Sequence, residues 1–97
     1  MAQPQTAPTR FYIEIYVSGI KKPFRSQVED VRVYTARTYS NTANISLEQA
    51  WNRVDRLVDD TARFTDSTPP PRLIDPSGNL LCFNPSAVQL VILHKLA

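Results

Sequence analysis

The sequence is poor in the residue types from which most recognisable chemical sites are built. Its 97 residues include one cysteine, Cys82, and one histidine, His94. A single cysteine cannot form an internal disulfide, and this pair cannot supply the four ligands of a structural zinc site. The two glycines, Gly19 and Gly78, are too few for a glycine-rich loop around a phosphate group. We therefore expect no metal and no cofactor.

Long apolar runs and a strong charge of one sign are also absent. The longest apolar stretch, 90–93, is four residues, whereas a membrane-spanning helix needs about 20. Residues 1–9 contain no apolar run of the kind found in a secretory signal peptide. The formal net charge of +2 is too small to indicate a nucleic-acid or membrane partner by charge alone. We expect a cytoplasmic protein without membrane association, which agrees with its unpaired cysteine.

Signals of catalysis are scarce. His94 lies in an apolar stretch, and no residue nearby in the sequence would orient its ring as a general base requires. Cys82 lies between Leu81 and Phe83, so we interpret it as a small core residue and not as a reactive thiol. No nucleophile motif or dinucleotide fingerprint occurs in the chain. We therefore predict that the protein is not an enzyme.

The length of the chain is that of one domain. We interpret residues 1–9, with two prolines and no hydrophobic periodicity, as a disordered leader. Residues 10–97 then form a single domain. So small a domain buries a limited fraction of its surface, and without disulfides or metals it often gains stability by forming oligomers.

Two stretches near the N-terminus alternate between apolar and polar residues, which is typical of strands. In residues 10–18, one face carries Phe11, Ile13, Ile15 and Val17, and the other carries Arg10, Tyr12, Glu14 and Tyr16. In residues 31–36, Val31, Val33 and Thr35 alternate with Arg32, Tyr34 and Ala36. We predict that the two segments pair antiparallel.

A helix is predicted from Ser46 onward. Ser46 and Gln49 have the spacing of a capping box. Apolar residues then recur at helical spacing and form one stripe: Leu47, Trp51, Val54, Leu57, Val58 and Phe64. Three prolines at 69–71 cannot continue the helix, and we interpret them as a stiff spacer.

The C-terminal third is predicted to contain three short strands. Residues 75–78, Asp-Pro-Ser-Gly, fit a type I turn between the two strands of a hairpin. The segment 87–96 is ambiguous, because Asn84 and Pro85 could begin a helix there. Its β-branched residues favour a strand. Both faces of that strand are apolar, so we expect it to be central or covered by a partner chain.

The predicted order is therefore strand, strand, helix and three strands. The simplest packing is an α+β domain, in which a small antiparallel or mixed sheet carries one amphipathic helix on one face. Polar and aromatic side chains then gather on the opposite face, and Tyr and Arg are enriched at binding hot spots. The candidate binding residues are Arg10, Tyr12, Tyr16, Arg32 and Tyr34, with Lys21, Lys22 and Arg25 from the adjoining loop.

Three interpretations of this surface are open. Cross-strand Tyr and Arg pairs can simply stabilise a solvated sheet, by about 0.2–1 kcal/mol each. The surface can also be a protein interface, most simply that of a homodimer formed by this face or by the apolar last strand. Thirdly, it can bind single-stranded nucleic acid or nucleotides by stacking and phosphate contacts. We predict a small, self-associating protein-interaction module, with nucleic-acid binding as the alternative.

Overall fold

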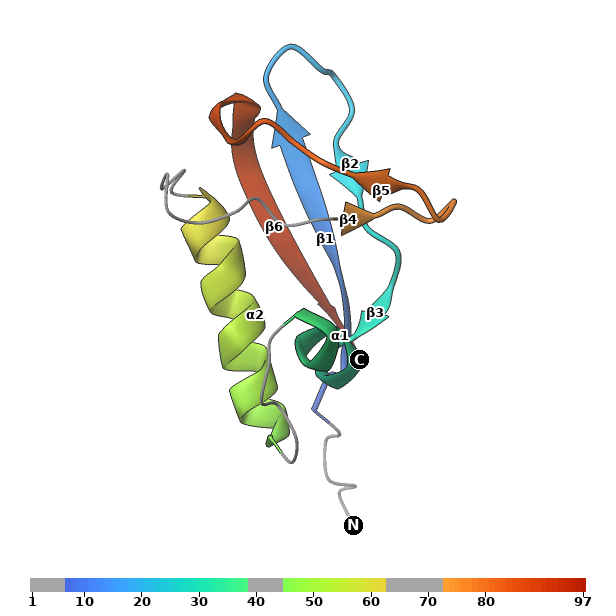
Figure 1. Cartoon of the computed structure of the whole chain (residues 1–97), viewed down its shortest axis with the longest axis vertical. Helices are drawn as coiled ribbons and strands as arrows, with labels where there is room; N and C mark the ends of the chain where they lie inside the picture. The colour runs from blue at the N-terminus through green and yellow to red at the C-terminus, as the bar shows by residue number, and fades with distance from the viewer. Residues whose placement is uncertain (1–6, 39–44, 63–72) are drawn as a thin grey trace.

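The structure is a computed structural model that describes residues 7–38, 45–62 and 73–97. A four-stranded antiparallel sheet has β1 between two short strands on one side and β6 on the other (Figure 1). The strands of this sheet are β1 (Arg10–Val17), β2 (Phe24–Arg25), β3 (Glu29–Asp30) and β6 (Val88–Leu96). A separate hairpin joins β4 (Leu73–Ile74) to β5 (Leu80–Leu81). The helices are α1 (Val31–Thr38) and α2 (Leu47–Ala62), with a 3-10 turn at Pro85–Ala87.

The α+β class is confirmed, as is the succession of early strands, a long amphipathic helix and later strands. The face assignment of β1 is confirmed as well, because Phe11, Ile13 and Ile15 are all buried. Phe11 meets Tyr34 of α1 edge-on at a centroid distance of 5.2 Å and Trp51 of α2 at 5.7 Å. Both of these helices therefore pack on the apolar face of β1.

The predicted strand over residues 31–36 is wrong, because this segment is helix α1. The side chain of Asp30 caps the helix: its Oδ1 accepts hydrogen bonds from the backbone amides of Arg32 and Val33. Helical spacing places Val31 and Tyr34 on the same buried face, and leaves Val33 62% exposed. Burial of one face and a good cap thus outweigh the weak strand preference of alternating β-branched residues.

The strand that pairs with β1 comes earlier in the chain than expected. β2 and β3 lie within 24–30, and both pair with β1. Between β2 and β3, Ser26 is also hydrogen-bonded to β1. Its amide donates to the Ile13 carbonyl at 2.8 Å, and its Oγ accepts a hydrogen bond from the Ile13 amide at 2.8 Å. Part of the predicted loop is therefore strand.

The start of α2 is as predicted. Gln49 and Ser46 form the reciprocal capping box: the Gln49 amide donates to Ser46 Oγ, and the Ser46 amide donates to Gln49 Oε1. Trp51, Val54 and Val58 are buried. Phe64 and the prolines at 69–71 lie outside the described residues.

The hairpin turn and the last strand are also confirmed. The amide of Gly78 donates to the Asp75 carbonyl at 2.9 Å, as a type I turn requires. Residues 88–96 form β6, which pairs with β1 along its whole length. Within the part of the chain that the structure describes, β6 pairs with no second strand, so it is an edge strand and not a central one. Cys82 follows β5 and is exposed, which corrects the core position predicted for it.

The N-terminal residues that the structure describes contribute to the packing. The Pro8 carbonyl accepts a hydrogen bond from Trp51 Nε1, and the Thr9 carbonyl accepts one from the Val31 amide, both at 2.7 Å. The first six residues of the predicted leader are outside the described residues. Among the described helices, none is long and apolar enough to cross a membrane.

Replacing Tyr34 by alanine is expected to lower the free energy of unfolding by about 3 kcal/mol, because the ring leaves a cavity beside Phe11. Val33→Ala, at the exposed neighbouring position, is the matched control and should change it by no more than about 0.5 kcal/mol. Urea denaturation followed by tryptophan fluorescence measures both values. If Val33→Ala lowered the free energy of unfolding more than Tyr34→Ala, the helical assignment of this segment would be contradicted.

Candidate functional site

The side of the sheet that faces away from the helices forms the candidate site. Tyr12, Glu14 and Tyr16 point to this side, because they alternate with the buried Phe11, Ile13 and Ile15. Cross-strand partners share a face, which adds residues from both neighbouring strands. We call this surface the open face: Arg10, Tyr12, Glu14 and Tyr16 of β1, Arg25 of β2, and Leu90, Ile92, His94 and Leu96 of β6.

A buried carboxylate lies at the centre of the open face. Glu14 is 4% exposed. Its Oε2 accepts a hydrogen bond from Arg25 Nε at 2.8 Å, and its Oε1 accepts one from the Tyr16 hydroxyl at 3.2 Å. His94 Nε2 lies 3.3 Å from the same Oε1. Side chains of three strands therefore enclose Glu14, and they satisfy the charge that burial would otherwise make costly.

Tyr12 stands in a row of stacked groups that runs across the sheet. The His94 ring lies against it at a centroid distance of 4.4 Å and an interplanar angle of 12°. The guanidinium carbon of Arg25 lies 5.5 Å from the Tyr12 ring centroid. Since His94 belongs to β6 and Arg25 to β2, on opposite sides of β1, the two groups cover the two faces of the phenol.

These contacts shift three pKa values. The hydrogen bond from Arg25 lowers the pKa of Glu14, against the opposing effect of burial. Burial, followed by the hydrogen bond to Glu14, raises the pKa of Tyr16. The hydrogen bond to Glu14 raises the pKa of Arg25. Each shift favours a charged Glu14–Arg25 pair beside a neutral phenol at neutral pH.

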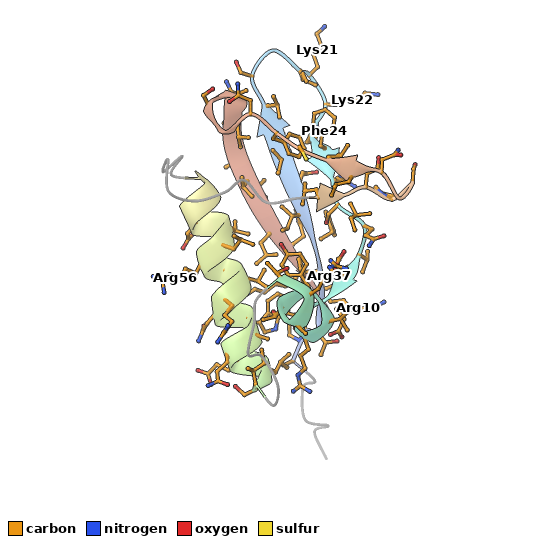
Figure 2. All side chains as sticks on the ribbon, viewed as in Figure 1. Arg10, Lys21, Lys22, Phe24, Arg37 and Arg56 are labelled. Carbon is orange, nitrogen blue, oxygen red and sulfur yellow. The ribbon has the colours of Figure 1, made fainter. Side chains whose placement is uncertain are left out.

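The structure brings together only part of the predicted binding residues. Arg10, Tyr12, Tyr16 and Arg25 lie on the open face, and Lys21 and Lys22 are exposed in the loop that follows β1 (Figure 2). Two residues are elsewhere, because their segment is helix α1: Arg32 is exposed on that helix, and Tyr34 is 6% exposed in the core. The predicted group of three tyrosines on one sheet face is therefore wrong.

Other residues of the open face were not among the candidate binding residues, although the last strand was considered as a separate dimer interface. Leu90, Ile92 and His94 join it because β6 pairs directly with β1. The structure also supplies the orienting partner that the sequence did not reveal for His94, namely Glu14 at 3.3 Å, 80 residues away in the chain. Glu14, a charged residue within the alternating pattern of 10–17, was the feature of the sequence that could have indicated this site. Its partners could not be predicted, because they depend on which strands pair.

An open hollow of about 360 Å³ adjoins the stacked row. It is lined by Tyr12, Arg25, Ser26, Gln27, Val28 and Pro76. The turn of the β4–β5 hairpin, through Pro76, therefore forms one wall, and β2 with the residues after it forms the other. The hollow gives the open face a concave margin beside the exposed Arg25.

The polar contacts of His94 and Ser26 are made within the chain. In the described part of the chain, His94 hydrogen-bonds to Glu14 and to no hydroxyl or thiol that it could activate. Ser26, the nearest serine to the site in the chain, is 7% exposed and donates its hydroxyl proton to the Gln27 carbonyl. Among the described residues, no group of three or more His, Cys, Asp and Glu side chains is arranged to hold a metal ion.

Stability is expected to fall in acid through Glu14. Above the ordinary glutamate pKa of 4.5, Glu14 is ionised in both the folded and the unfolded chain, and its stabilising contribution is complete. Because folding lowers its pKa, this contribution is lost as the pH falls through the lower folded value. Glu14→Gln should therefore flatten the curve of unfolding free energy between pH 7 and strongly acid pH. Glu48→Gln, which removes an exposed carboxylate on α2, is the control and should leave the Glu14 component in place. An unaltered curve for Glu14→Gln would contradict the pairing.

No protein-family model, no curated protein and no solved structure matches the chain. We therefore argue its function from the geometry and the chemistry of the open face.

Proposed function

We propose that the protein is a small, non-enzymatic interaction module that binds a protein partner through the open face. The observation that carries the proposal is that both described helices and Leu73 of β4 belong to one core on the other side of the sheet. The open face contributes no residue to that core, yet it holds ordered aromatic, cationic and aliphatic side chains.

The open face has the composition of a binding hot spot. Tyr12, Tyr16 and Arg25 are residue types enriched where partners dock. Their contacts with Glu14 and His94 already fix their positions. A partner that docks on them therefore pays less side-chain entropy than it would on free side chains.

The β6 half of the open face supplies apolar area. Leu90 is 47% exposed although it is paired with Tyr16 of β1 within the sheet. Ile92 follows it on the same face. Leu90 also forms a cross-strand pair with Tyr16. Together with Ile92 it gives a docking partner apolar contact area.

Nucleic-acid binding by base stacking is less well supported. Tyr34 lies in the core, and His94 and Arg25 occupy the two faces of the Tyr12 ring. Stacking of a base requires an uncovered aromatic face. Tyr16 alone of the three predicted tyrosines has no ring partner among the described contacts, and one such ring is a poor platform.

The proposal is tested by Leu90→Glu, which places a carboxylate in the apolar half of the open face. Binding, whether to a second copy or to a protein that co-purifies from the source cells, should weaken about tenfold or more, because an apolar contact is replaced by a charge that must be desolvated. Sedimentation velocity from micromolar to millimolar concentrations measures self-association. Quantitative affinity purification measures other partners.

Leu80→Glu is the matched control, because Leu80 is 57% exposed on the β4–β5 hairpin. This variant should bind as the unmodified chain does. Two results together would contradict an interaction through the open face: the chain stays monomeric at every concentration, and the same proteins co-purify with both variants.

A further inference from the structure

The open face and its adjoining loop are basic. Arg10 is exposed at one end of β1, and Lys21 and Lys22 are exposed in the loop beyond the other end (Figure 2). The Arg25 side chain is 61% exposed between them. Glu14 is buried and already paired with Arg25, and Asp30, the cross-strand partner of Arg10, is half-buried and caps α1. Among the described residues, the exposed charges of this surface are therefore mainly cationic.

Several carboxylates elsewhere in the chain are engaged in local contacts. Glu29 pairs with Arg37 at 2.6 Å, and Asp55 lies 3.4 Å from Lys95. Asp75 accepts hydrogen bonds from the amides of the hairpin turn. These carboxylates are therefore already engaged within the chain.

Arg25 has donors left for an anion. Its Nε donates to Glu14, and its two terminal nitrogens have no partner among the described residues. The Glu14 contact fixes the guanidinium in position, so a carboxylate that meets the terminal nitrogens finds a pre-oriented donor pair. Because the faces of the Tyr12 ring are occupied, a ligand meets this group at its polar edge and not by stacking.

The cations are spaced for an extended chain. Arg25 lies opposite Glu14, four residues along β1 from Arg10, which corresponds to about 13 Å at the rise of a β-strand. An extended peptide with an acidic residue at every fourth position has the same repeat. The lysine pair beyond the end of β1 continues the row along the long axis of the molecule (Figure 2).

We infer that the partner of the open face is an extended acidic polypeptide segment, which places carboxylates on Arg10, Arg25 and the Lys21–Lys22 pair and apolar side chains on Leu90 and Ile92. This inference rests on the proposed function and names the class of partner. Charge complementarity selects it over a second copy of the chain, because face-to-face pairing of two open faces would bring like charges together.

The test is an NMR titration of the isotopically labelled chain at low and at physiological salt. The probe is a synthetic peptide with glutamate at every fourth position and leucine or serine between, and its neutral control has glutamine in place of each glutamate. We expect the acidic peptide to shift the amide signals of β1, β2 and β6, with affinity that falls as salt is added. The glutamine peptide should bind roughly tenfold to a hundredfold more weakly, because three surface ion pairs that each contribute about two- to fivefold multiply together.

Charge variants locate the contact. Arg10→Gln and Lys22→Gln should each weaken binding of the acidic peptide about two- to fivefold. Arg56→Gln, on the exposed side of α2 (Figure 2), removes the same charge elsewhere and should leave the affinity unchanged. Arg25→Gln is made together with Glu14→Gln, so that no buried carboxylate is left without its partner, and the double variant should weaken binding as the other two do.

The outcomes separate the inference from the function it rests on. Four results would each overturn the acidic-peptide inference. The two peptides could bind equally, the signal shifts could be confined to α2, or no binding could occur at low salt. An oligothymidylate of similar length, titrated in the same way, could also bind more tightly than the acidic peptide. Self-association that Leu90→Glu abolishes would also overturn the inference, but would leave the interaction module standing. A chain that binds neither peptide nor itself, and retains no partner through Leu90, would remove both.

Discussion

The hydrogen bond between Glu14 and Arg25 is the interaction on which the open face depends. Burial alone would neutralise a carboxylate or expel it from the sheet, and the guanidinium at 2.8 Å keeps it ionised and in place. Once Glu14 is fixed, Tyr16 and His94 have a common acceptor, and Arg25 is held over Tyr12. One buried charge thus orders side chains from three strands into a single surface.

The same strand builds the core and the site. Every second residue of β1 enters the core, where Phe11 meets Tyr34 and Trp51. The intervening residues form the open face. Because the helices pack on one side only, the period of two that stabilises the sheet also separates its structural face from the surface proposed to bind.

Local patterns predicted well the elements whose residues satisfy one another nearby. The Ser46–Gln49 capping box, the Asp75–Gly78 turn and the alternation of β1 depend on contacts within a few residues, and all three are present. The strand predicted for segment 31–36 was wrong because its residues alternate as those of a strand do, whereas the cap at Asp30 and the burial of Tyr34 favour a helix. Period-two alternation is weak support when a good helix cap precedes it.

The α+β class, the apolar face of β1 and the start of α2 can be predicted from the amino-acid order alone, because they follow from periodicity and capping along the chain. The pairing of the strands, and therefore the side chains that surround Glu14, depends on how the whole chain packs. The contact between His94 and Glu14 joins residues 80 positions apart, and it exists because β6 aligns with β1 in one register. Residue spacing along the chain does not encode that register, since it is set by which side chains of the two strands pack best together.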